Sequence, residues 1–229
     1  MEVLAVIPAR GGSRGLPGKN LAELAGRPLL AYTADCVGDC LRPVRAVLST
    51  DDEAVARLGR RLGLEVPFRR PAELAADDTP TLPVIQHALA ELSAAEGYRP
   101  EVVAVLQPTS PLRNAAHLEA ALELFSSIDC DSLISLAPVE HHPAWAWRIV
   151  DGLAVPENAD PPRRRQDLPP LHRPNGAVYL TTPELLAADR LLGRRIAALT
   201  MEPWESVDID DAWDLAVAEA ALIFRSRNR

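Results

Sequence analysis

The stretch "VLAVIPARGGSRGLPGKN" (residues 3–20) places a short apolar, β-branched run directly before a glycine-rich, cationic loop. The run suits a strand that is buried on both faces of a sheet. Glycines let the backbone turn tightly, and inward-pointing N–H groups can then hold phosphate oxygens. The loop also contains Lys19, the single lysine among 24 lysine and arginine residues. Because the chain otherwise uses arginine, we infer that this compact ammonium group has a role that a planar guanidinium could not fill.

The spacing of the loop excludes two familiar phosphate-binding motifs. A dinucleotide-binding G-x-G-x-x-G pattern fails because Arg10 stands two residues before Gly12. A Walker A loop requires a glycine where the chain has Ser13, and a serine or threonine where it has Asn20. Taken alone, the loop is equally compatible with phosphate binding and with a solvent-exposed turn that carries scattered positive charge.

Strand-like and helix-like segments alternate along the chain after this loop. Such alternation predicts a mainly parallel sheet covered by helices on both faces, with ligands beyond the carboxyl ends of the strands. We expect strands at 44–50, 65–69 (weak), 101–108, 132–138, 175–182 and 196–201. Helices are expected at 28–40, 51–64, 81–95, 115–127 and, after a carboxylate-rich turn, within 208–225.

The composition changes at residue 141 and returns to the earlier pattern near residue 172. An Asp-Gly pair between two alternating runs is a hairpin signal, and a segment rich in proline and arginine follows it. Trp145 and Trp147 are expected to share one face of a hairpin strand, as packing or interface residues. We interpret 1–229 as a single domain with 141–172 as an excursion from its sheet.

Composition and charge narrow the class of protein. A formal net charge of −8 argues against nucleic acid or an anionic membrane surface as the main partner. The three cysteines match no metal-ligand spacing and are interpreted as reduced core thiols. Because the chain shows neither a cleavable signal nor an apolar run long enough to span a bilayer, we expect a soluble, cytoplasmic protein.

The chain contains, in order, the six blocks "IPARGGSRGLPGKN" (7–20), "RRPAELAADDT" (69–79), "LQPTSPLR" (106–113), "EHHPAW" (140–145), "RPNGAVY" (173–179) and "SVDIDDAWDL" (206–215). These blocks resemble, in the same order, the acylneuraminate cytidylyltransferases, the CTP-dependent enzymes that make CMP-sialic acids. The resemblance implies a Rossmann-like α/β nucleotidyltransferase fold and the transfer of CMP from CTP to an acidic sugar with release of pyrophosphate. The related Kdo enzymes differ, with proline in place of Asn20 and an acidic "QGDEP" stretch in place of "QPTSPLR".

The resemblance also implies roles for individual residues. Arg10 and Lys19 would offset charge on the α-phosphate and the leaving pyrophosphate, with Arg14 adding to it. The full set implied for the nucleotide is Ala9, Arg10, Gly11, Gly12, Ser13, Arg14, Lys19, Asn20, Arg70, Thr81 and Gln107. The set implied for the acceptor is Gln107, Arg165, Arg173, Asn175 and Tyr179, in which an arginine fork suits a carboxylate.

Asp208 and Asp210 alternate along an extended segment, so both carboxylates face one side. Spacing alone leaves two interpretations open, which are a Mg²⁺ site and a capping pair for the following helix. Asp211 is better placed for the capping task. With the resemblance, we interpret Asp208 and Asp210 as catalytic ligands of Mg²⁺.

Three functional hypotheses remain beside one another. The first is a Mg²⁺-dependent cytidylyltransferase acting on a nonulosonic acid, as a homodimer in which the 141–172 excursion contacts the partner. Several sialic acid members have a lysine where Trp145 stands, which leaves the particular sugar open. The second hypothesis is the same transfer of CMP from CTP, with a small phosphonate such as phosphonoformate as the acceptor. The third is a nucleotide-binding protein without catalysis.

Overall fold

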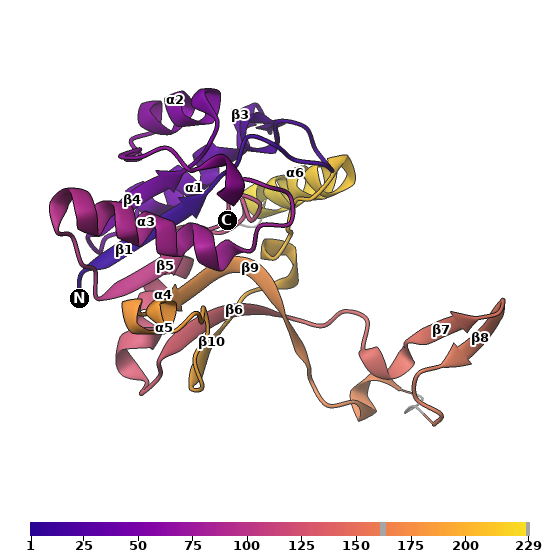
Figure 1. Cartoon of the computed structure of the whole chain (residues 1–229). Helices are drawn as coiled ribbons and strands as arrows, with labels where there is room; N and C mark the ends of the chain where they lie inside the picture. The colour runs from indigo at the N-terminus through magenta and orange to yellow at the C-terminus, as the bar shows by residue number, and fades with distance from the viewer. Residues whose placement is uncertain (161–163, 228–229) are drawn as a thin grey trace.

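The computed structural model describes residues 1–160 and 164–227 and places six strands in one central sheet (Figure 1). Their order across the sheet is β10-β6-β9-β5-β1-β4. The strands are β1 (Val3–Pro8), β4 (Val44–Ser49), β5 (Val102–Val105), β6 (Ser132–Pro138), β9 (His172–Thr181) and β10 (Ile196–Thr200). The helices are α1 (Leu29–Gly38), α2 (Glu53–Arg61), α3 (Thr81–Glu96), α4 (Ala115–Ser127), α5 (Pro183–Ala187) and α6 (Ala212–Arg227).

The sheet is mainly parallel, as the alternation of segments predicts. β1 pairs in parallel with β4 and β5, and β10 pairs in parallel with β6. β9 is the exception, because it lies antiparallel between β5 and β6. It returns from the excursion, so it enters the sheet from the edge at which its neighbours end.

Helices cover both faces of the sheet, which confirms the predicted layers. Leu30 of α1, Leu58 of α2 and Leu118 of α4 pack in one buried cluster with one face of the strands. Ile85 of α3 and Leu186 of α5 pack in the cluster on the opposite face. β1 runs between these layers, and every residue of the strand except Pro8 is buried.

The weak strand expected at residues 65–69 does not form. The segment makes an isolated bridge between Val47 and Glu65, and Pro67 then follows. Proline has no N–H to continue a ladder, which explains why the pairing stops there. Short elements complete the described chain: β2 (Glu23–Leu24), β3 (Arg27–Pro28), η1 (Lys19–Leu21), η2 (Ala72–Leu74), η3 (Pro143–Trp145), η4 (Arg165–Asp167) and η5 (Pro203–Glu205).

The excursion contains the predicted hairpin, formed by β7 (Trp147–Val150) and β8 (Leu153–Pro156). Asp151 and Gly152 have positive φ values of 51° and 79°. Two successive positive φ values are the geometry of a primed two-residue turn, which matches the twist of the paired strands. Figure 1 shows this hairpin projecting from the body of the molecule. Trp145 ends η3 instead of lying in β7, so the expected pairing of Trp145 and Trp147 on one strand is wrong.

The cysteines are free thiols, with Cys36 buried and Cys40 and Cys130 half-buried. None of the helices in the described part of the chain combines the length and the apolar character that crossing a lipid bilayer requires.

At Gly59, helix propensity and packing predict opposite effects of an alanine on the free energy of unfolding. A Cβ at Gly59 in α2 would lie 2.2 Å from Cδ2 of the fully buried Leu48. Propensity alone would make Gly59→Ala stabilising by roughly 0.5–1 kcal/mol. We expect the clash to dominate and to lower the free energy of unfolding by about 1–3 kcal/mol, measured by urea denaturation. Gly38→Ala is the control, because no atom lies within 4 Å of a Cβ there. Equal stability of the Gly59→Ala and wild-type proteins would show that Leu48 repacks freely.

Candidate functional site

A cavity of about 350 Å³ lies beyond the carboxyl ends of β1 and β5. This is the edge at which parallel sheets bind ligands. The lining brings together residues from distant parts of the chain: Pro8, Arg10, Gly12, Ser13, Lys19, Asn20, Arg70, Leu74, Ala76, Asp77, Thr79, Thr81, Val84, Gln107, Pro108, Thr109, Asp208 and Asp210.

Lys19 joins the glycine-rich loop to the segment that precedes α6. Its ammonium donates to the carbonyl oxygen of Ile209 at 2.8 Å and contacts Oδ1 of Asp210 at 3.0 Å. The side chain is 12% exposed, so the charge lies in a narrow space between the two segments. A compact ammonium fits this space and still borders the cavity.

Asp77 pairs with both arginines of the loop. Its carboxylate pairs with Arg10 at 3.1 Å and also accepts from Nε of Arg14. Arg10 donates further to the carbonyl oxygen of Ala76 at 2.7 Å. Arg10 borders the cavity, whereas Arg14 is 83% exposed and does not line it. Sequence reasoning missed Asp77, because only the fold brings it opposite the loop.

Some backbone N–H groups of the loop form hydrogen bonds within the protein. The N–H of Ala9 donates to Ser49 at 2.9 Å, and the N–H of Gly11 donates to Oδ1 of Asp51 at 3.0 Å. Gly12 and Ser13 line the cavity. Of the predicted phosphate cradle, Gly11 thus has its N–H directed to a carboxylate, which is a correction to the role expected from the glycine pattern.

Three residues predicted to contact the nucleotide, Arg70, Thr81 and Gln107, line the cavity. Arg70 is buried and donates to the hydroxyl and carbonyl oxygens of Ser49. Burial lowers the pKa of Arg70 to about 10, against the opposing effect of Asp51, so the guanidinium stays charged at neutral pH. Thr81 opens α3, and Gln107 follows β5. Asn20 is buried nearby, and its amide donates to the carbonyl oxygen of Arg10 at 2.8 Å.

Asp208 and Asp210 both line the cavity, as their alternation predicts. Asp208 faces the open cavity, yet protein surrounds its other sides. Burial raises its pKa, a hydrogen bond from Thr109 and the charge of Lys19 oppose the rise, and Asp210 and Asp214 add to it. This carboxylate is incompletely compensated, which suits a cation. Asp211 caps the following helix by accepting from the N–H groups of Trp213 at 2.8 Å and Asp214 at 3.0 Å, as predicted.

No group of three or more histidine, cysteine, aspartate or glutamate side chains clusters for a metal among residues 1–160 and 164–227. Two carboxylates are nevertheless enough for Mg²⁺ when substrate phosphates and water supply its other oxygen ligands. The pair Asp208 and Asp210 therefore fits Mg²⁺. The protein supplies two of the ligands and does not form a complete cage around the ion.

Of the residues expected around the acceptor, Gln107 lines the cavity, whereas Arg173, Asn175 and Tyr179 do not. Arg173 lies on β9 and borders a second hollow beside α6, which shares Asp208 with the first. Tyr179 is half-buried, and burial raises its pKa, with the charge of Asp208 adding to the rise. The side chain of Arg165 lies outside the described part of the structure.

Asn175 is buried, with 2% of its surface exposed. Its amide donates to Oγ of Ser206 at 2.9 Å and to Sδ of Met201, and its Oδ1 accepts from Oγ of Ser135 at 2.6 Å and from the N–H of Ala177. These contacts use the full capacity of the amide. The expected contact of the Asn175 side chain with the acceptor is therefore corrected to an internal one.

Comparison with known proteins gives consistent results. A family model described as cytidylyltransferase matches residues 4–137. The N-acylneuraminate cytidylyltransferase of Streptococcus agalactiae serotype III is 33% identical over 98% of this chain, which spans 54% of that relative. The CMP-N,N'-diacetyllegionaminic acid synthase of Legionella pneumophila is 32% identical. The alignment covers 97% of this chain and 97% of that relative. The chain thus spans about half the length of the first relative and nearly all of the second.

Solved structures share the fold at low identity. CMP:2-keto-3-deoxy-manno-octonic acid synthetase, solved with CTP, aligns with a TM-score of 0.70 at 16% identity, over 98% of this chain and 100% of that one. The 4-diphosphocytidyl-2C-methyl-D-erythritol synthase of Anaerococcus prevotii aligns with a TM-score of 0.62 at 13% identity, over 97% and 98%. Both confirm the α/β nucleotidyltransferase architecture.

Gly15 is the point at which the loop touches the segment before α6. A Cβ there would lie 2.3 Å from the carbonyl oxygen of Asp210. Gly15→Ala must therefore push the two segments apart and weaken the contacts of Lys19. We expect a loss of about 1–3 kcal/mol in the free energy of unfolding, with faster amide hydrogen exchange at residues 206–210. In Gly12→Ala a Cβ meets nothing within 4 Å, so that variant should keep its stability. Unchanged exchange in Gly15→Ala would contradict this contact.

Proposed function

Because the chain belongs to the cytidylyltransferase family, we propose that it transfers CMP from CTP to a sialic-acid-like nonulosonic acid and releases pyrophosphate. The observation that carries the proposal is the meeting of Lys19, Arg10 and the Asp208–Asp210 pair around one cavity at the carboxyl edge of the sheet. Phosphoryl-type transfer requires charge neutralisation and positioning more than covalent participation by the protein.

In the proposed reaction, a hydroxyl of the acceptor attacks the α-phosphorus of CTP in line. The bond from the α-phosphorus to the oxygen that bridges to the β-phosphate breaks, pyrophosphate leaves, and the hydroxyl proton passes to water. Gly12 and Ser13 border the path of the triphosphate, while Arg10 and Lys19 neutralise charge that grows on the leaving pyrophosphate. Arg10 would exchange its partner Asp77 for phosphate oxygens. The ion pair of Arg14 with Asp77 would still hold the loop to the segment that contains Asp77.

Asp208 and Asp210 would hold Mg²⁺ at the edge of the same cavity. When bound, Mg²⁺ supplies charge neutralisation and orientation of phosphate oxygens. Arg70, Thr81 and Gln107 are proposed to bind the cytosine and the ribose. The amide of Gln107 offers both a donor and an acceptor, which is what an edge of cytosine requires.

Arg173 and Tyr179 are proposed on the acceptor side. Arg173 borders the hollow that shares Asp208 with the nucleotide cavity, so a carboxylate bound there would lie beside the proposed reaction centre. Burial and the neighbouring Asp208 both keep the Tyr179 phenol protonated, which leaves it able to donate a hydrogen bond.

An acceptor panel tests the proposed function. The purified protein is incubated with CTP, Mg²⁺ and one acceptor at a time, namely N-acetylneuraminate, legionaminic acid, pseudaminic acid or phosphonoformate, and pyrophosphate release is measured. We expect turnover with at least one nonulosonic acid. Turnover with phosphonoformate alone would overturn the proposed acceptor, and binding of CTP without turnover on any acceptor would favour a non-catalytic nucleotide-binding protein.

Lys19→Ala should lower kcat by roughly a hundredfold or more, because an ammonium aimed at developing charge acts mainly in the transition state. Lys19→Arg should restore little of the rate, since the narrow space around Nζ does not suit a planar fork. Steady-state kinetics check both variants, with circular dichroism and thermal melting as the controls for folding. A near-normal rate in folded Lys19→Ala would refute the role of the ammonium.

The β7–β8 hairpin is proposed to contact a second copy of the chain. Its exposed apolar side chains include Trp147 (62%) and Ile149 (83%). Such a surface on a projecting hairpin is stabilised when a partner covers it. We expect the wild-type protein to sediment as a dimer and Ile149→Glu as a monomer in analytical ultracentrifugation. Leu41→Glu is the matched control, because Leu41 is 89% exposed on the body of the molecule. A wild-type monomer, or a dimeric Ile149→Glu variant, would exclude this interface.

A further inference from the structure

The segment between β10 and α6 contains both candidate metal ligands, yet residues 206–209 have no regular secondary structure. No ladder of backbone hydrogen bonds fixes the direction in which Asp208 points. The placement of its carboxylate must therefore depend on side chains that hold the segment on either side.

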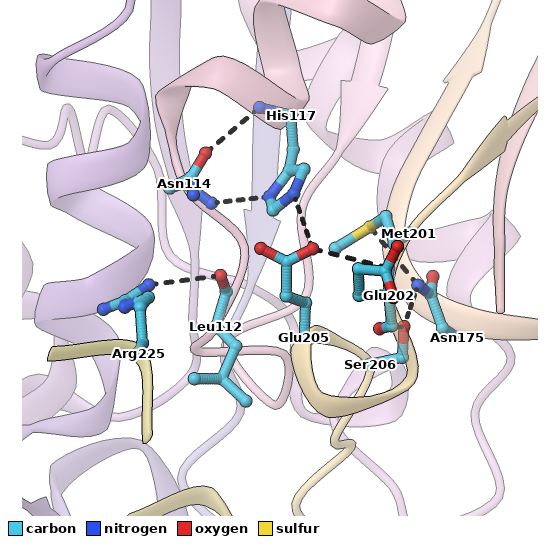
Figure 2. Close-up of polar contacts among 9 residues, drawn as sticks. All are labelled: Leu112, Asn114, His117, Asn175, Met201, Glu202, Glu205, Ser206 and Arg225. Atoms are coloured by element: carbon cyan, nitrogen blue, oxygen red, sulfur yellow. Dashed lines mark hydrogen bonds and ion pairs between the residues drawn. The ribbon is translucent and has the colours of Figure 1, made fainter. Parts of the chain in front are cut away.

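The first of these contacts is a hydrogen bond between α4 and η5. Nε2 of His117 lies 3.2 Å from Oε2 of Glu205, and the two side chains are only 16% and 14% exposed (Figure 2). Nδ1 of His117 accepts from the N–H of Asn114 at 3.2 Å, within the capping box of α4. Since Nδ1 accepts, Nε2 carries the proton and donates to the carboxylate. The helix end thus sets the tautomer that holds Glu205.

Glu205 and its neighbour then fix the turn itself. Oε2 of Glu205 also accepts from the N–H of Glu202, which closes η5 as a capping box. Oγ of Ser206 donates to the carbonyl oxygen of Glu202 at 2.9 Å and accepts from Nδ2 of Asn175 at 2.9 Å, as Figure 2 shows. Ser206 is buried, so this point of the segment is tied to β9.

The far side of the segment is held three residues later. The N–H of Ile209 donates to the carbonyl oxygen of Thr109 at 2.8 Å, and its own carbonyl oxygen accepts from Lys19. Ile209 is fully buried. Asp208 therefore lies between two buried, hydrogen-bonded residues, Ser206 and Ile209, and its carboxylate faces the cavity.

We propose that Glu205, held by His117, and Ser206, held by Asn175, are positioning residues that fix Asp208 and Asp210 for the metal of the reaction proposed above. Neither His117 nor Glu205 lines the cavity, so both act through the segment and not on the substrate. Asn175 thus gains a role in place of the acceptor contact expected for it. Groups of this kind, one step behind a ligand, hold the ligand in its productive orientation.

The test compares Glu205→Ala, Glu205→Gln and Ser206→Ala with the wild-type full-length protein. The first readout is amide hydrogen exchange at residues 206–211 without nucleotide or metal. We expect roughly tenfold faster exchange in Glu205→Ala and Ser206→Ala, because each loses buried hydrogen bonds that close the segment. Glu205→Gln should restore slow exchange, since the amide oxygen still accepts from His117 and from Glu202.

The second readout is the response to Mg²⁺. The Mg²⁺ concentration that gives half the maximal rate should rise roughly tenfold in Glu205→Ala, as for partners that orient metal ligands. The affinity for CTP in EDTA should stay unchanged, because the nucleotide contacts lie elsewhere in the cavity. An equal loss of CTP affinity in EDTA would show general damage and would overturn the positioning role.

Glu91→Ala is the matched control. It removes another His–Glu pair, His87 with Glu91 at 3.7 Å on α3, which has no link to residues 206–210. Exchange at 206–211 should not change in this variant. If Glu205→Ala does not fold, Ser206→Ala alone decides the first readout, and unchanged exchange there overturns the proposal. A wild-type protein that transfers no CMP would refute the proposed function, whereas the exchange data would still decide the positioning role.

Discussion

The ammonium of Lys19 is the contact on which the arrangement of the site depends. It lies in the first loop of the chain and binds Ile209 and Asp210, 190 and 191 residues further on. A parallel sheet brings both segments to one edge, but it does not fix the distance between them. The lysine sets that distance, and Gly15 allows it by leaving no side chain in the way. Donor loop and carboxylate segment thus behave as one unit.

The cationic side chains of this unit are already paired with carboxylates before any ligand enters. Asp77 pairs with both Arg10 and Arg14, Asp210 pairs with Lys19, and Asp51 accepts from the backbone at Gly11. The triphosphate of the proposed substrate would have to replace carboxylates that pair with these cations. Its affinity therefore depends on the difference between the two sets of ion pairs, and not on its attraction to the cations alone.

Local patterns predicted the layers of the fold well, because apolar periodicity reports burial directly. The capping role of Asp211 and the Asp-Gly turn of the hairpin are confirmed for the same reason, since each depends on neighbours within a few residues. The failures at the candidate site are of another kind. The internal role of Asn175 depends on Ser135 and Ser206, 40 and 31 residues away, and the His117–Glu205 pair joins residues 88 apart. No spacing rule predicts such contacts. The family resemblance implied an acceptor contact for Asn175, and only the fold shows that its side chain is buried and fully bonded within the protein.

The antiparallel placement of β9 has a consequence for how this architecture diversifies. Pro138 at the end of β6 pairs with His172 at the start of β9, and Val139 donates to Leu171 at 2.9 Å. The two ends of the excursion are therefore joined in the sheet, at the same edge as the cavity that Asp208 borders. A change in the length or sequence of the excursion would leave the register of the six strands intact. The excursion and the residues that line the cavity can therefore vary independently of each other.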